Sequence, residues 1–336
     1  MMTSQGLFDL QVNGFAGVDF NAGTFRAGEI DHALEAMRRT GVTTCLPTII
    51  TAHPETLFER FKALDAAIAA SRLGPAMCPG YHLEGPFLNP LPGYSGCHPA
   101  DAMTGVSLTL VERLETSLTR PILMVTVAPE IEGALDLIRT LAERGKIMAL
   151  GHTACDFETA QAAAQAGATL STHLGNGLPQ TLHKLVNPIF AQLAEDGLWA
   201  SFIADGIHLH PLALKGLLRA KGLPRSILVT DAVVGAAAPP GRYTFAGMAV
   251  ERQDDGSVRL PESGSLAGAA LCLDQAVRNV VMWGLASRED ALAMASTHPR
   301  HLLAPAFAAH GLTVNAGRVT WNDALEVAEV TIETAP

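Results

Sequence analysis

Short runs of apolar and β-branched residues alternate along the chain with longer segments whose apolar residues recur every three or four positions. The short runs predict buried β-strands, and the longer segments predict amphipathic helices. The expected strands are 7–13, 43–50, 79–84, 123–128, 147–152, 168–174, 199–205 and 226–231. The expected helices are 28–39, 54–71, 131–145, 156–166, 188–195 and 211–221. This alternation indicates parallel strands joined by helical crossovers.

Eight strands in this rhythm match the number that closes a barrel, so we predict an α/β fold with a (β/α)8, TIM-like barrel. An open, doubly wound sheet is the structural alternative, and it normally carries a glycine-rich nucleotide-binding loop after its first strand. Gly14 and Gly17 follow the first expected strand, but their spacing differs from that fingerprint and no third glycine completes it. The barrel is therefore the favoured architecture.

The pattern changes after the eighth strand. The expected elements there are a β-hairpin over 242–260 around Asp255-Gly256, helices over 270–284 and 288–303, and a strand over 325–334. The expected domains are a barrel with C-terminal helices over 6–241 and 262–312, and a small β module over 242–261 and 313–336. We therefore predict a barrel with a reduced satellite module.

Composition narrows the class of protein. Apolar residues make up 48% of the 336 residues and charged residues 17%, which is enough for a large core. The net charge of −10 argues against nucleic acid or an anionic membrane as the main partner. No apolar run is long enough to span a membrane, and no secretory signal pattern opens the chain. Five scattered cysteines without a CxxC pair indicate reduced thiols, so we expect a cytoplasmic protein.

Four ionisable residues lie at the carboxyl ends of four expected strands: Glu84, His152, His173 and Asp231. These ends open on one face of a barrel, where active sites form, so the four side chains should converge. A single histidine of this kind could be a buried residue satisfied by hydrogen bonds. Four ionisable groups together would be costly to desolvate without a charge partner, which favours a functional site.

The residue types suggest a metal site. One carboxylate and two imidazoles (Glu84, His152 and His173) suit Zn²⁺ or a similar divalent ion and leave a position open for water. Such an ion lowers the pKa of a bound water toward ~7. Asp231 would then act as general base and acid, taking a proton from the water and passing it to a leaving amine.

Three further histidines lie near these strand ends. His98 follows the third expected strand and His208 follows the seventh, and each could polarise a carbonyl, hold a substrate hydroxyl, or simply lie on a surface loop. His82 shares one side of its strand with Glu84, so it could be a ligand or part of a packed layer inside the barrel.

The ordered segments DLQVNG, HLEGPFLNP, GHT, THLGNG, ADGIHLHP, VTDA and SLAGAALCLDQAVRN resemble those of N-acetylglucosamine-6-phosphate deacetylases, within the amidohydrolase superfamily, over residues 6–303. The resemblance implies metal ligands at Glu84, His152 and His173, and a catalytic acid/base at Asp231. The residues that it implies for substrate binding are His98, Asn176, Gly177, Lys184 and His208. It also implies a homodimer.

Gln11 and Asn13 stand where many amidohydrolases carry a His-x-His pair, so they look like a remnant of a second metal site. The resemblance thus implies one divalent ion per subunit, with Zn²⁺ expected and Fe²⁺, Mn²⁺ or Co²⁺ as alternatives. The chain also departs from the family. Lys184 replaces an arginine that binds substrate phosphate across the dimer, and lysine lacks the bidentate fork. Six residues precede the first strand, where the family has a few dozen.

The sequence thus predicts a metal-dependent amide hydrolase that removes the acetyl group from an N-acetylated aminosugar, with N-acetylglucosamine-6-phosphate as the expected substrate. One alternative keeps the barrel but acts on a non-phosphorylated N-acetyl sugar, an N-acyl amino acid or a cyclic amide. A second alternative is a non-catalytic sugar-binding barrel, and retention of the whole set of ionisable residues argues against it.

Overall fold

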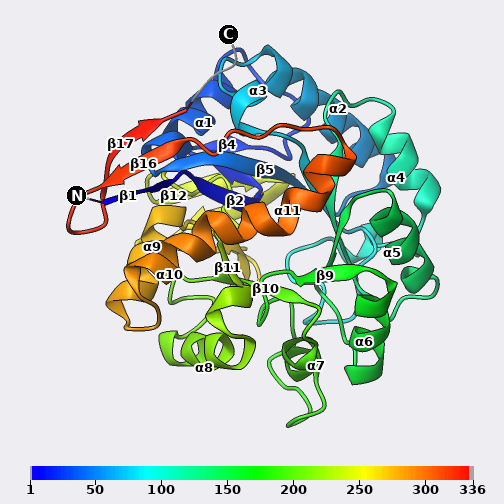
Figure 1. Ribbon diagram of the computed structural model, residues 1–336. Coiled ribbons are helices and arrows are strands. Elements are labelled where there is room, and N and C mark those ends of the chain that lie inside the picture. Colours follow the sequence, from blue (N-terminus) through cyan, green and yellow to red (C-terminus); the bar gives the residue numbers. More distant parts are fainter. Residues whose placement is uncertain (1, 333–336) are drawn as a thin grey trace.

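A computed structural model describes residues 2–332 of the chain (Figure 1). Its central strands are β2 (Leu7–Val12), β5 (Val42–Ile50), β6 (Tyr81–Glu84), β7 (Ile122–Val127), β8 (Ile147–Leu150), β9 (Ala168–Ser171), β10 (Trp199–Ile203) and β11 (Ser226–Val229). They form one parallel sheet in the order β11-β10-β9-β8-β7-β6-β5-β2. The predicted α/β fold is confirmed, because this sheet curves into a nearly closed barrel with helices around it.

The helices follow the predicted alternation with the strands. They are α1 (Glu29–Arg39), α2 (Pro54–Ala70), α3 (Gly74–Met77), α4 (Leu108–Glu115), α5 (Ala134–Glu143), α6 (Phe157–Ala166), α7 (Pro188–Ala194), α8 (Pro211–Lys221), α9 (Leu273–Met282), α10 (Arg288–Ala295) and α11 (Thr297–Ala309). The single helix predicted over 288–303 is wrong, because α10 ends before Ser296 and α11 begins after it. Pro299 explains the break, since a proline ring clashes with the carbonyl four residues earlier, at Ala295.

The barrel closes between β2 and β11 without a regular ladder. The Asp231 amide donates a hydrogen bond to the Gln11 carbonyl at 3.0 Å. The buried Asp9 carboxylate accepts hydrogen bonds from Thr230 N, Thr230 Oγ1 and Gln11 N. Burial raises the pKa of Asp9 to about 7. Asp9 therefore ties the first strand to the segment that carries Asp231.

Three C-terminal helices cover this seam. Helices α9, α10 and α11 pack against both β2 and β11, and Figure 1 shows them lying across these strands. From α11, Arg300 donates to the Gly6 carbonyl and to Thr43 and Thr44 hydroxyls at 3.0 to 3.2 Å. The C-terminal third of the chain thereby holds the barrel shut.

The remaining strands form small antiparallel sheets outside the barrel. One sheet contains β12 (Gly241–Phe245), β13 (Met248–Arg252), β14 (Ser257–Arg259) and β15 (Leu266–Ala269). The second contains β1 (Met2–Gln5), β16 (Arg318–Trp321) and β17 (Val327–Thr331), and β3 (Gly14–Phe15) pairs with β4 (Val18–Asp19). We refer to the β12–β15 sheet as the satellite sheet.

Two sequence expectations for this region need adjustment. The hairpin predicted around Asp255-Gly256 is found between β13 and β14, but the segment also contains β12, which pairs with β13 through a turn at Ala246-Gly247, where both residues have positive φ. The strand expected over 325–334 is found as β17, and residues 333 and 334 lie outside the described residues. The predicted division into a barrel and one small β module stays a prediction. The strands of that module belong to two separate sheets, β12, β13 and β14 to one, and β16 and β17 to the other.

Within residues 2–332, none of the helices combines the length and apolar character needed to cross a membrane.

Replacing Asp9 should destabilise the barrel seam. In Asp9→Ala, the buried Thr230 and Gln11 amides lose their acceptor, so we expect the free energy of unfolding to fall by at least about 2 kcal/mol. Urea unfolding measures this change. Asp254→Ala, in an exposed turn, is the matched control and should stay within about 0.5 kcal/mol of the original protein. If both variants unfold like the original protein, Asp9 does not hold the seam.

Candidate active site

The predicted site residues lie where four central strands end. Glu84 is the last residue of β6. His152, His173 and Asp231 lie two residues beyond the ends of β8, β9 and β11, respectively, so these strands end earlier than predicted. The reason is backbone conformation, because φ is 51° at His152, 31° at His173 and 50° at Asp231. Residues other than glycine rarely adopt such angles, and they cluster at functional sites.

The Glu84 carboxylate is the centre of the site and is only 2% exposed. Its Oε1 accepts a hydrogen bond from Gln11 Nε2 at 3.0 Å and lies 2.9 Å from His173 Nε2 and 3.6 Å from His152 Nε2. Its Oε2 lies 3.8 Å from His98 Nε2. Burial acts to raise the pKa of Glu84, but the neighbouring His152 and His173 side chains outweigh it, and the pKa falls well below its ordinary value. Glu84 is therefore a buried anion surrounded by imidazoles.

The tautomers of two of these imidazoles follow from their other hydrogen bonds. His152 Nδ1 lies 2.6 Å from the Tyr94 carbonyl, which only accepts, so Nδ1 carries the proton. Thr51 Oγ1 donates to the Glu84 carbonyl, so it accepts from His98 Nδ1 at 2.9 Å. Burial, with His152 nearby, lowers the pKa of His98 to about 3, which keeps this ring neutral. Both Nε2 lone pairs consequently face the carboxylate of Glu84.

Lone pairs that face a carboxylate repel it unless a cation lies between them. The separations of 3.6 and 3.8 Å fit a divalent ion bound at about 2.0–2.2 Å from nitrogen and oxygen. A metal-binding histidine also usually donates its other ring N–H to a backbone carbonyl, as His152 Nδ1 does to Tyr94. Ligand atoms of Glu84, His98 and His152 all lie within 4.8 Å of one another. The donor set therefore fits a divalent metal ion.

His173 completes this cluster and gives a second candidate ligand set. Its Nδ1 is buried and has no hydrogen-bond partner within the described chain, so only Nε2 orients the ring. His152 and His173 both face Oε1 of Glu84, whereas His98 faces Oε2. The two histidines predicted as ligands, His152 and His173, thus converge on one oxygen of Glu84, the third predicted ligand. His98, predicted to contact substrate, lies close enough to Glu84 to be a metal ligand in place of His173.

Asp231 stands beside this cluster and is held by the two amides that the sequence assigned to a second metal site. Asn13 Nδ2 donates to Asp231 Oδ1 at 2.8 Å, and Gln11 Nε2 donates to it at 3.1 Å. Gln11 thereby bridges Asp231 and Glu84. Burial, with the charge of Glu84, raises the pKa of Asp231 to about 6. Gln11 and Asn13 therefore act as hydrogen-bond donors to the two carboxylates.

The loop after His173, which contains Asn176 and Gly177, packs closely against the His152 ring. A Cβ on Gly177, whose φ is 62°, would lie 2.6 Å from His152 Nδ1, so only glycine leaves room for the imidazole. Asn176 Nδ2 donates to the His173 carbonyl at 3.0 Å. Both residues line the pocket described next, in keeping with their predicted place near the substrate.

These residues open into a pocket of about 800 Å³, large enough for a small organic ligand. His208 also lines it, and its Nδ1 lies 2.6 Å from Asp205 Oδ2, which orients the ring and leaves Nε2 without a hydrogen-bond partner among residues 2–332. Lys184, by contrast, is exposed on the loop before α7 and does not line the pocket. Arg259 does line it. Sequence reasoning missed Arg259, because it lies on the satellite sheet, far in sequence from the barrel strand ends.

His82 is a packing residue of the barrel interior. It is fully buried, its Nε2 lies 2.7 Å from Thr126 Oγ1, and its Nδ1 lies 3.4 Å from Thr48 Oγ1. Burial lowers the pKa of His82 to about 4, so the ring is neutral. Of the two interpretations open from the sequence, the packed layer is the one that these contacts support.

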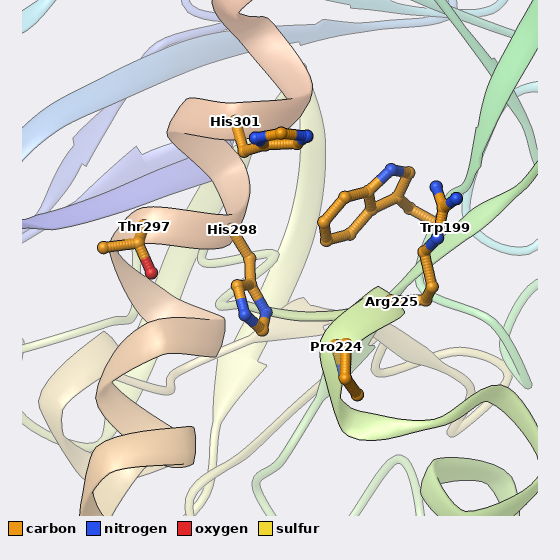
Figure 2. A pocket seen from close by; sticks show the side chains of 6 residues that line it. All are labelled: Trp199, Pro224, Arg225, Thr297, His298 and His301. Atoms are coloured by element: carbon orange, nitrogen blue, oxygen red, sulfur yellow. The ribbon is translucent and has the colours of Figure 1, made fainter.

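A second pocket, of about 510 Å³, lies at the other ends of the strands (Figure 2). Its lining residues are Trp199, Pro224, Arg225, Thr297, His298 and His301. Trp199 begins β10 and Arg225 directly precedes β11, so this pocket lies at the amino ends of the strands. The Arg225 guanidinium lies 5.2 Å from the centre of the Trp199 ring. Active sites of barrels form at the carboxyl ends, so this pocket is separate from the cluster around Glu84.

Comparison with known proteins gives relatives that align with most of the chain. An N-acetylgalactosamine-6-phosphate deacetylase of Escherichia coli O157:H7 is 35% identical over 296 residues, which cover 88% of this chain and 76% of the relative. N-acetylglucosamine-6-phosphate deacetylases of Bacillus subtilis (strain 168) and Homo sapiens are 32% and 34% identical. They cover 82% and 89% of this chain, and 68% and 73% of the relatives. No protein-family model matches the chain.

Solved structures show the same similarity. A mutant N-acetyl-D-glucosamine-6-phosphate deacetylase from Mycobacterium smegmatis, in complex with N-acetyl-D-glucosamine-6-phosphate, superposes with a TM-score of 0.86 at 27% identity. The match covers 98% of this chain and 85% of that chain. The N-acetylglucosamine-6-phosphate deacetylase from Thermotoga maritima gives a TM-score of 0.83 at 27% identity, covering 98% and 87%. The match thus extends over nearly the whole chain.

Single substitutions distinguish the two candidate ligand sets. We expect His152→Ala and His173→Ala to lose most of the bound divalent metal, because these rings share Oε1 of Glu84. His98→Ala should keep it. Metal content per chain after dialysis, measured by mass spectrometry, gives the answer. The opposite pattern, with metal lost in His98→Ala and kept in His173→Ala, would assign the ion to Glu84, His98 and His152.

Proposed function

The chain belongs to the N-acetylglucosamine-6-phosphate deacetylase family, and on that premise we propose that it removes the acetyl group from an N-acetylated aminosugar 6-phosphate. The observation that carries the proposal is the pairing of a buried donor cluster at Glu84 with a second carboxylate, Asp231, that opens into the same pocket. This combination suits hydrolysis of an amide, which needs an activated water and a proton shuttle. The reaction yields acetate and the free aminosugar phosphate.

A divalent ion held by Glu84, His152 and His173 would polarise the amide carbonyl and lower the pKa of a water. One Zn²⁺ per chain is the proposed cofactor, because a carboxylate with two imidazoles is a common catalytic zinc set. The proposal of one ion is supported by the residue types at Gln11 and Asn13, since a side-chain amide offers a metal only a neutral, weak oxygen ligand, and the amide nitrogens of both residues donate to the carboxylates.

Asp231 is the residue that moves the proton. Asn13 and Gln11 hold its Oδ1, and none of residues 2–332 donates a hydrogen bond to its Oδ2. Oδ2 is therefore the atom that takes a proton from the attacking water and then delivers it to the departing nitrogen. A pKa of about 6 suits both steps near neutral pH, because the carboxyl group can lose and regain the proton.

His208 and His98 are proposed to orient the substrate. Asp205 fixes the His208 ring, so its Nε2 presents a hydrogen-bond partner to a ligand in the pocket. His98 lies beside Glu84 and is oriented by Thr51. Asn176 and Gly177 form the neighbouring wall. These residues can hold an acyl oxygen and sugar hydroxyls.

We also propose a homodimer that uses the loop before α7 and the first turn of that helix. Leu185, Val186 and Phe190 are 63%, 54% and 45% exposed, which is unusual for large apolar side chains grouped in one segment. Lys184 lies in the same segment. If this segment packs on a second copy, Lys184 comes close to the partner's pocket, as the family resemblance implies.

The proposed role of Asp231 is tested by Asp231→Asn. The variant should keep its metal, because Asp231 is not among the proposed ligands. It should lose acetate release from N-acetylglucosamine-6-phosphate by at least about 100-fold in kcat, because it has no group to shuttle the proton. Asp254→Asn is the control. Activity of Asp231→Asn close to that of the original protein would contradict the proposed mechanism.

A further inference from the structure

The active-site pocket contains one permanently charged cation of its own. Among the described residues that line it, Arg259 is the only arginine or lysine. It is the last residue of β14, so it belongs to the satellite sheet, while Glu84 and Asp231 come from the barrel. A guanidinium stays protonated at any pH that proteins tolerate. The pocket thus has a fixed positive charge on a wall that the barrel does not build.

Two hydrogen bonds fix the Arg259 guanidinium. Its Nε donates to Ser257 Oγ at 3.1 Å, and its Nη1 donates to the Gly264 carbonyl at 2.8 Å. A guanidinium has five N–H groups, so three remain available. Within residues 2–332, no carboxylate lies at ion-pair distance from this side chain. A half-buried, oriented cation without an anion is what a site for an anionic ligand requires.

The loop that follows Arg259 adds further donors to the same wall. Backbone bonds between Leu260 and Ser265 and between Gly264 and Leu260, at 2.9 and 2.8 Å, close the loop. Ser263 and Ser265 both line the pocket. Hydroxyl groups beside a guanidinium match the three oxygens of a phosphate monoester, which accepts several hydrogen bonds at once.

We infer that Arg259 binds the phosphate group of the substrate and that this residue determines the preference for a phosphorylated over a neutral aminosugar. The inference rests on the proposed function, because it specifies the charge of the ligand for that same pocket. Each chain then supplies its phosphate-binding charge from its own satellite sheet. The barrel supplies the groups that act on the amide.

The test compares two substrates of one enzyme. For each variant, kcat/KM is measured on N-acetylglucosamine-6-phosphate and on N-acetylglucosamine, and the ratio of the two values is the readout. We expect Arg259→Gln to lower this ratio by about 10- to 100-fold, mainly through KM, because a charged hydrogen bond to the phosphate is lost. Arg259→Lys keeps the positive charge but not the bidentate hydrogen-bonding geometry of the guanidinium, so it should restore part of the lost ratio. Arg242→Gln, exposed on the same sheet, is the matched control and should leave the ratio unchanged.

Binding to an inactive background separates this inference from the proposed function. Titration calorimetry with N-acetylglucosamine-6-phosphate on Asp231→Asn should show binding, and the further change Arg259→Gln should weaken it by a similar factor. An unchanged ratio and unchanged binding in Arg259→Gln overturn the inference, while the original enzyme still deacetylates. If Lys184→Ala removes the phosphate preference and Arg259→Gln does not, the inference is also wrong. If the original enzyme deacetylates neither sugar, the proposed function itself fails.

Discussion

The buried negative charge of Glu84 is the constraint on which the rest of the site depends. A carboxylate that is 2% exposed costs several kcal/mol to desolvate, and that cost must be met by partners in close contact. Gln11, His173, His152 and His98 all direct a nitrogen toward it. At least two of these nitrogens present lone pairs, which repel the carboxylate. The negative charge of Glu84 is therefore fully compensated only when a cation lies between them. Metal binding is thus a consequence of how the charge is buried.

The fold brings these groups together by bending the backbone where strands end. His152, His173 and Asp231 all have positive φ, which stops each strand and turns its side chain into the pocket. The seam at Asp9 keeps Asp231 in register with Gln11. In our account the barrel therefore provides the chemistry, whereas the satellite sheet adds the recognition of charge through Arg259.

Much of this arrangement can be predicted from the sequence, because the barrel strands are strongly apolar and their ends carry ionisable residues. The eight strands and the convergence of Glu84, His152, His173 and Asp231 follow from that pattern alone. Other features depend on contacts between distant segments. The roles of Gln11 and Asn13 as donors, and the place of Arg259 in the pocket, arise from tertiary packing. The break between α10 and α11 has a local cause, Pro299, which the helical periodicity conceals.

The most direct test of the central claim is the metal content of Glu84→Gln. The substitution keeps the size of the side chain but removes the charge that the imidazoles surround. After loading with Zn²⁺ and dialysis, the original chain should retain one ion, and Glu84→Gln should retain almost none. Glu289→Gln, on an exposed helix end, should behave like the original. Equal metal content in Glu84→Gln and the original chain would contradict the claim that the buried carboxylate organises a metal site.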